Sequence, residues 1–164
     1  MIFITVGTHE QGMERLLKEV DNLIENKQIN EEVFAQIGYS KYIPKNYKYK
    51  NLIGYDEMNE FIKKSQIVIT HGGPGSIFHV IQNGKIPIVV PRNSSFNEHV
   101  DDHQILFTKR MQKENKIIAV YDIKDLGDKI SNYLSLKNKC NIIKNNKNIF
   151  IEKFDMKIRE IIKR

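Results

Sequence analysis

The sequence predicts an α/β fold with a Rossmann-like parallel sheet and helices on both faces. Two observations support this prediction. Short apolar runs rich in β-branched residues alternate along the chain with segments whose apolar residues recur at helical spacing. The composition, with 40% hydrophobic and 28% charged residues, is that of an ordinary globular domain. A length of 164 residues favours one domain, and no apolar run approaches the roughly 20 residues that span a bilayer.

Six runs are expected to form the strands, because each is short and apolar and several are bounded by glycine, proline or asparagine. They cover residues 1–6, 32–38, 51–55, 66–70, 86–91 and 117–121.

The helices are expected between these strands, where apolar residues follow a 3.6-residue period. Asp56 is the predicted N-cap of the second helix. The predicted helices cover residues 13–26, 56–64, 76–83, 101–115 and 125–134, followed by a low-complexity loop at 137–148 and an amphipathic helix with a basic face at 149–164.

Charge and cysteine content narrow the class of protein. The net charge of +6 favours an anionic partner, and residues 41–51 interleave lysine with tyrosine. That stretch fits either a nucleic-acid surface or, as we favour, a solvated connecting loop. A single cysteine, Cys140, excludes an internal disulfide. The first residues lack a basic region and a cleavage site, so a cytoplasmic location is expected.

Three polar loops follow predicted strands, where open parallel sheets bind ligands. They read GTHEQG (7–12), HGGPGS (71–76) and RNSSFNEHVDDHQ (92–104). A helix that starts near Pro74 or Gly75 would expose unpaired backbone amides at its first turn. Glycines there allow a close approach of the ligand, and the helix dipole favours an anion. The sequence therefore predicts a phosphate-binding turn, with a tight strand–helix junction as the alternative.

The motifs GTHEQ, THGGPGS with NGKIPIVVPR, and EHVDDHQ resemble the C-terminal, donor-binding half of glycosyltransferase family 28 over roughly residues 1–134. The nearest likeness is to short bacterial polysaccharide subunits of the PssE and EpsF type and to the eukaryotic dolichol-pathway UDP-GlcNAc transferase catalytic subunit. The resemblance implies a domain equivalent to the C-terminal half of a GT-B enzyme, and an inverting reaction without metal or cofactor.

In these short-subunit families the acceptor-binding half is a separate, membrane-associated protein. The resemblance thus implies the donor-binding catalytic subunit of a two-component UDP-sugar-dependent hexosyltransferase, held at the inner face of the plasma membrane by a membrane-anchored partner. It would transfer a hexose, first of all β-1,4-galactose, to a lipid-pyrophosphate-linked glycan in exopolysaccharide or capsule synthesis, without nucleic acid. The alternatives are a non-catalytic enhancer subunit and a nucleotide- or nucleic-acid-binding module.

The resemblance also implies two parts of the chain. Residues 1–134 would form the UDP-sugar-binding domain, and 135–164 a loop and helix that pack on this domain or on the partner.

Residue roles follow from the same likeness, by position. Tyr55 would contact uracil, and Gln104, beside Asp102, the hexose hydroxyls. Glu98 would contact sugar or acceptor, and His71 is a structural residue or a contact of the donor sugar. The donor diphosphate would lie on two glycine segments, Gly7, Thr8 and His9 in the first and Gly72, Gly73, Pro74, Gly75 and Ser76 in the second.

Two roles are less direct. His79 stands where many relatives carry a glutamate that binds the ribose hydroxyls, so it either replaces that contact or packs on the helix. The catalytic base is His9, Glu10 or a group of the partner, because a base should titrate near neutrality and reach the acceptor hydroxyl. No metal site is expected.

Overall fold

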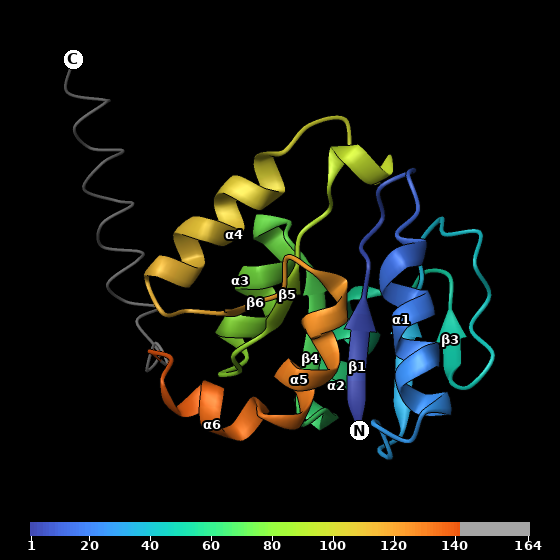
Figure 1. Ribbon diagram of the computed structural model, residues 1–164, viewed down its shortest axis with the longest axis horizontal. Helices are drawn as coiled ribbons and strands as arrows, with labels where there is room; N and C mark the ends of the chain where they lie inside the picture. Colours follow the sequence, from blue (N-terminus) through green and yellow to red (C-terminus); the bar gives the residue numbers. More distant parts are fainter. Residues whose placement is uncertain (142–164) are drawn as a thin grey trace.

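The computed structural model describes residues 1–141 of the chain (Figure 1). Its centre is a six-stranded sheet in the order β3-β2-β1-β4-β5-β6, and every neighbouring pair is parallel. The strands are β1 (Ile2–Thr5), β2 (Val33–Gln36), β3 (Lys48–Lys50), β4 (Ile67–His71), β5 (Ile88–Val90) and β6 (Ile118–Ala119). The prediction of a Rossmann-like parallel sheet is confirmed.

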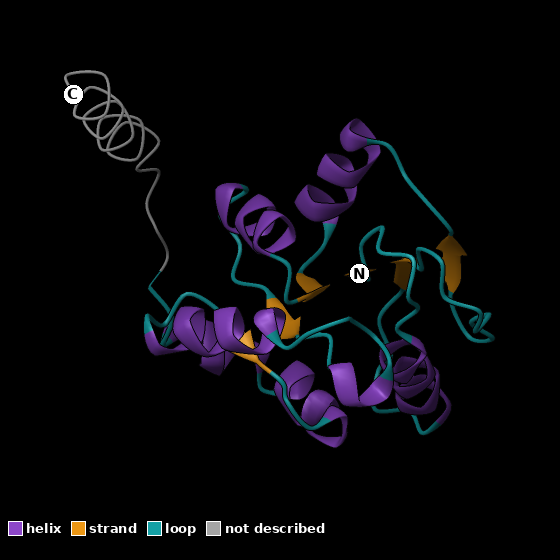
Figure 2. Ribbon diagram, turned by 90° about the horizontal axis from the view of Figure 1, so that it is seen from above, coloured by secondary structure: helices purple, strands orange, loops and turns teal. Residues whose placement is uncertain are grey.

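Helices cover both faces of the sheet, as Figure 2 shows. They are α1 (Glu14–Glu25), α2 (Tyr55–Lys64), α3 (Pro74–Gln82), α4 (His103–Lys113), α5 (Leu126–Ser131) and α6 (Tyr133–Asn138), with short 3₁₀ turns η1 (Ser94–Phe96) and η2 (Ile123–Asp125). Side chains alternate along β1, so Ile2 and Ile4 pack on one face with α1 and α5, whereas Phe3 packs on the other with α2 and α3.

The order of the strands creates a switch point beside β1. The chain runs from β1 outward through β2 to β3, then returns to β4 on the other side of β1. Because all strands are parallel, their carboxyl ends meet at one edge, and the loops after β1 and β4 diverge to helices on opposite faces. Such a divergence leaves a crevice, the usual ligand site of these folds.

The predicted strand at 51–55 is wrong. The third strand is Lys48–Lys50, whose residues are all exposed because β3 is the edge strand and pairs only with β2. An exposed edge strand needs no apolar pattern, and lysines are common there. Of the apolar residues that suggested a strand, Ile53 instead packs beside the cluster around Phe3.

Two helix predictions also change at their ends. Asp56 is not the N-cap of α2, because the helix begins at Tyr55 after Gly54 and Asp56 lies in the first turn. The predicted helix at 125–134 is divided into α5 and α6 at Asn132, whose backbone N–H and side-chain amide both donate to the Asp128 carbonyl oxygen at 3.0 Å.

The C-terminal predictions are tested only in part. Helix α6 reaches Asn138, so the first residues of the loop predicted at 137–148 are helical. The predicted helix at 149–164 lies outside the described residues. Among the helices that the structure describes, none combines the length and apolar character needed to cross a membrane.

Candidate functional site

A cavity of about 620 Å³ opens at the carboxyl ends of β1 and β4, at the switch point of the sheet. Its walls are the loop after β1, the turn between β4 and α3, and the first residues of α2, with Gln104 from α4. Eleven of the predicted site residues line it: Gly7, Thr8, His9, Tyr55, His71, Gly73, Pro74, Gly75, Ser76, His79 and Gln104.

The start of α3 forms one wall of this cavity. Pro74 occupies the first helical position, and the Gly73 N-cap makes no side-chain cap. The first amides of the helix therefore lack a side-chain acceptor. A Cβ at Gly75 would meet no atom within 4 Å, so the backbone here is open toward the cavity. This arrangement suits an anion.

His71 organises the turn before α3. Its Nδ1 accepts from the Gly73 N–H at 3.0 Å, and its Nε2 lies 2.8 Å from the Ser76 hydroxyl. Its pKa is lowered to about 4, first by burial and next by the charge of Arg92. Nδ1 also lies 3.4 Å from Oε1 of Gln104, a longer contact than the one with the Gly73 N–H, so we assign the ring proton to Nε2. In this tautomer Nε2 donates to Ser76, which leaves the Ser76 proton free for another acceptor.

Gly7 shows why the loop after β1 begins with glycine. Its φ of +77° lies in the left-handed region, and a Cβ there would stand 2.5 Å from Nε2 of His71. Glycine thus lets this loop pass close to the turn before α3. His9 follows on the same loop, and its Nδ1 accepts from the Gln11 N–H at 3.2 Å. Burial, then Arg92 and His99, lower the pKa of His9, whereas Glu10 opposes them.

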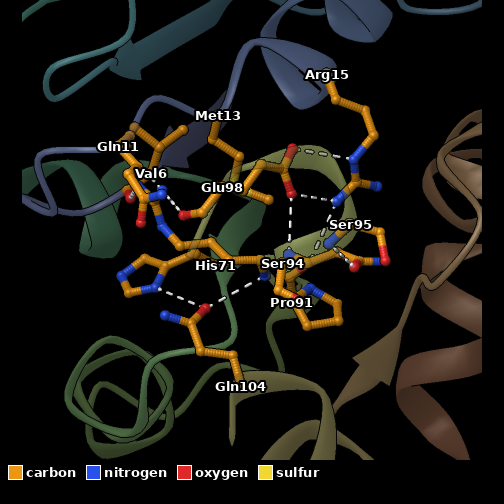
Figure 3. Close-up of polar contacts among 12 residues, drawn as sticks. Val6, Gln11, Met13, Arg15, His71, Pro91, Ser94, Ser95, Glu98 and Gln104 are labelled. Carbon is orange, nitrogen blue, oxygen red and sulfur yellow. Dashed lines mark hydrogen bonds and ion pairs between the residues drawn. The ribbon is translucent and has the colours of Figure 1, made fainter. Parts of the chain in front are cut away.

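A buried arginine, Arg92, holds this loop from beneath. Its side chain is 1% exposed and donates to backbone carbonyl oxygens of two loops. The shortest of these bonds reach Gln11 (2.6 Å), Val6 (2.7 Å) and Glu98 (2.7 Å). In Figure 3, the residues whose carbonyl oxygens accept these bonds, Val6, Gln11 and Glu98, lie above His71. Arg92 therefore ties residues 6–12 to the loop after β5.

A second arginine completes the clamp. Arg15 of α1 donates to both carboxylate oxygens of Glu98, at 3.1 and 2.9 Å, and to the Pro91 carbonyl at 3.2 Å (Figure 3). Glu98 also accepts from the Asn93 N–H at 3.1 Å. The carboxylate of Glu98 is thus directed to Arg15, whereas Arg92 bonds to carbonyl oxygens. We call Arg15, Arg92 and Glu98 the arginine clamp.

The far end of the cavity is aromatic. The Tyr55 ring stacks on His79, with centroids 5.2 Å apart and planes 9° apart, and Tyr55 is 73% exposed. His79 Nε2 lies 2.6 Å from Oδ1 of Asn59, and burial lowers the His79 pKa. The exposed Tyr55 ring can stack on an aromatic ring of a ligand, and the His79 imidazole can form hydrogen bonds with the ligand's hydroxyl groups.

Four predicted residues do not line the cavity. Glu10 is exposed, and Gly72 packs under α4, where a Cβ would stand 2.9 Å from Cβ of Gln104. Glu98 is buried in the arginine clamp, and Asp102 accepts from the Ser94 hydroxyl at 2.7 Å.

The sequence reasoning missed both arginines of the clamp. The signal for Arg92 was weak: a lone charge directly after an apolar strand run, in VVPR. Arg15 lies in a helix pattern where a surface arginine is ordinary.

The histidine–aspartate group of the third loop forms its own contacts. Asp101 lies 3.1 Å from Nδ1 of His99 and 2.7 Å from Nδ1 of His103. Within residues 1–141, no three His, Cys, Asp or Glu side chains come together in a group that could hold a metal ion.

The sequence matches a family model over residues 1–164, that of the glycosyltransferase family 28 C-terminal domain. It is 30% identical over 129 residues to the human UDP-N-acetylglucosamine transferase subunit ALG13, a match that covers 71% of this chain. The chain spans about a tenth of that relative, since the match covers 10% of its length.

The fold is similar to the crystal structure of MurG from Acinetobacter baumannii, with a TM-score of 0.55 and 16% identity. That similarity covers 84% of this chain and 42% of the MurG chain. The prediction of a Rossmann-like domain equivalent to half of a GT-B glycosyltransferase is thereby confirmed.

Proposed function

The chain belongs to the glycosyltransferase family 28 C-terminal domain family, and we propose on that premise that it binds the UDP-sugar donor of a two-component hexosyltransferase. The observation that carries the proposal is the cavity at the start of α3. There an open helix N-terminus, the Ser76 hydroxyl and the glycine loop after β1 face one space. A diphosphate is the anion that fits backbone amides and a hydroxyl donor at this position.

The two ends of the cavity suit the two ends of such a donor. The diphosphate would lie on Gly73, Gly75 and Ser76, and the nucleoside toward Tyr55 and His79. Gln104 lines the cavity beside His71, where its amide is within reach of a hexose hydroxyl. Its oxygen already accepts weakly from the Arg92 N–H at 3.3 Å, so its NH₂ group is the end that would serve the sugar.

The chemistry of transfer fits a site built on hydrogen-bond donors. The departing nucleoside diphosphate gains negative charge in the transition state, and preorganised amides and hydroxyls stabilise such charge. In this proposal the site uses neither a metal nor another cofactor. The proton of the acceptor hydroxyl needs a base, which this chain or the partner would supply; on the loop after β1, His9 lines the cavity and Glu10 does not.

The partner and the acceptor belong to the proposal as well. The human relative is named a transferase subunit, which supports a partner subunit for this chain. We propose that the partner is membrane-anchored, binds a lipid-pyrophosphate-linked glycan and holds this chain at the inner face of the plasma membrane, in exopolysaccharide or capsule synthesis. UDP-galactose, for a β-1,4 linkage, is the first donor to test, and UDP-N-acetylglucosamine, named in the relative, the second.

Calorimetric titration of the purified chain with UDP, UDP-galactose, UDP-N-acetylglucosamine, UDP-glucuronate and a short RNA tests the donor site. We expect UDP and at least one UDP-sugar to bind. Ser76→Ala should weaken UDP binding about tenfold, since a hydrogen bond to a charged group contributes about 1.5 kcal/mol. The control Ser135→Ala, at an exposed residue of α6, should bind like the wild type.

Binding of RNA without UDP would contradict the proposal and support a nucleic-acid module. Transfer is then tested with the co-expressed partner on a lipid-linked acceptor. If the partner alone transfers the sugar at a lower rate that this chain raises, the chain is an enhancer and not the donor-binding subunit.

A further inference from the structure

The hydrogen bond to Nδ1 of His9 bears on its role. The Gln11 backbone N–H donates to Nδ1 at 3.2 Å, and a backbone amide cannot reverse its polarity. Nδ1 must therefore carry a lone pair, and the neutral ring carries its proton on Nε2. A ring in this tautomer has no free nitrogen lone pair to take a proton. It offers a hydrogen-bond donor instead.

From this geometry we infer that His9 presents its Nε2–H to an oxygen of the bound ligand and is not the base of the reaction. The inference rests on the proposed function for the ligand, an oxygen-rich nucleoside diphosphate sugar. The tautomer of His9, in contrast, is inferred only from the hydrogen bond within this chain and does not depend on the ligand. His9 lines the cavity on the same loop as Gly7 and Thr8, so its Nε2 edge is near the space assigned to the donor.

The same device recurs at His71. There too the backbone N–H two residues on, that of Gly73, donates to Nδ1, and Nε2 is 2.8 Å from the Ser76 hydroxyl. His71 is thus a positioning residue that turns the Ser76 proton outward. Two histidines, one on the loop after β1 and one at the end of β4, are each fixed by a backbone amide and supply donors to one cavity. An anion is the ligand that such a set of donors favours.

The surroundings lower the pKa of His9 and so disfavour the charged ring. Arg92 lies beneath the loop, and the His99 ring is 4.7 Å from the His9 ring between centroids. Both disfavour a second positive charge on His9, together with its burial, whereas the exposed Glu10 favours one. The carboxylate of Glu98 accepts from Arg15 and lies close enough to Arg92 to favour the charged form of that arginine. A neutral His9 donates a hydrogen bond to the anion without having to gain or lose a proton when the ligand binds.

The tautomer can be measured without any ligand. We expect a long-range ¹H–¹⁵N correlation spectrum of the ¹⁵N-histidine-labelled chain at pH 7.5 to show a protonated Nε2 and a bare Nδ1 for His9 and His71. Assignment uses His9→Gln and His71→Gln variants, each of which removes one set of signals. A protonated Nδ1 on His9 would overturn the inference, whatever the protein binds.

Two substitutions separate a donor from a base. His9→Gln keeps an N–H near the Nε2 position but has no basic nitrogen, whereas His9→Ala removes both. We expect His9→Gln to weaken UDP binding less than His9→Ala does, and to lower the transfer rate with the co-expressed partner by no more than that loss of binding accounts for. His9→Ala should weaken UDP binding about tenfold. Unchanged unfolding temperatures of both variants confirm that the fold is intact.

Two results would contradict the inference about His9, and a third would contradict the proposed function. If His9→Gln binds UDP normally but loses transfer by a hundredfold or more, as loss of a general base does, His9 is the base and the inference fails. If His9→Ala binds UDP as well as the wild type, His9 does not contact the ligand and the inference also fails. A wild-type chain that binds no UDP overturns the proposed function itself.

Discussion

The turn before α3 and the arginine clamp lie side by side at one edge of the sheet, yet they are held by opposite means. The turn depends on neutral hydrogen bonds of one histidine, His71, within a six-residue segment. The clamp uses three charged side chains from distant parts of the chain, Arg15, Arg92 and Glu98. The comparison teaches that the loops are fixed to each other by charge, whereas the surface offered to the ligand is kept neutral and rich in donors.

The largest effect is expected from Arg92→Met. It leaves the carbonyl oxygens of Gln11, Val6 and Glu98 without their donor, and each buried acceptor left unpaired costs about 1–3 kcal/mol. We expect the free energy of unfolding to fall by at least about 3 kcal/mol. Urea titration measures it.

The matched control is Arg110→Met, at an arginine of α4 whose side chain is 79% exposed. This substitution should lower the free energy of unfolding by less than about 0.5 kcal/mol. Equal losses in the two variants would show that Arg92 does not join the loops.

The pH dependence of His71 is the next largest effect. Its pKa is about 4 in the folded chain, below the ordinary 6.5, so the unfolded chain binds more protons between these values. This contribution to stability is complete above pH 6.5 and is lost as the pH falls toward 4. Between pH 7.5 and pH 5 the loss should be about 2 kcal/mol.

Urea titrations at the two pH values, on the wild type and on His71→Gln, measure this loss. The variant should lack this part of the pH dependence. An identical slope in both proteins would mean that the turn does not depend on a neutral His71.

The smallest effect is expected from Glu98→Gln. The amide still accepts from Arg15 or Asn93, but the ion pair with Arg15 is lost, so unfolding should be easier by about 1–2 kcal/mol. Glu10→Gln, at the exposed glutamate of the neighbouring loop, should change stability by under about 0.5 kcal/mol. Thermal unfolding of both variants measures the difference. If Glu98→Gln is as stable as Glu10→Gln, the clamp is held by Arg92 alone.

The sequence predicted the cavity better than the clamp, for a physical reason. Alternating strands and helices place all β→α loops at one edge, so the polar loops after β1 and β4 had to meet there. Pro74 as the first residue of a helix followed from its fixed φ. A buried arginine bonded to carbonyl oxygens leaves no such pattern, because any loop has carbonyls to offer.

Two facts of the structure cannot be predicted from the local sequence pattern: the direction of a side chain and the exposure of a strand. Glu98, a polar residue in a loop after a strand, was expected to contact the ligand, but its carboxylate accepts from Arg15. The edge strand β3 has no apolar residue pattern because neither its faces nor its outer edge are covered. Both facts depend on neighbours far away in the sequence.

Gly75 carries a consequence for how this sequence is maintained. Nothing in the empty protein stands where its Cβ would be, and alanine within a helix is favoured over glycine by up to about 1 kcal/mol. Selection for a stable fold alone would therefore replace this glycine. A methyl group there would contact no atom of the protein, and Gly75 lines the cavity, so a bound molecule is what can require glycine at this position. The stability that the helix loses at Gly75 therefore reflects how closely that molecule approaches the backbone.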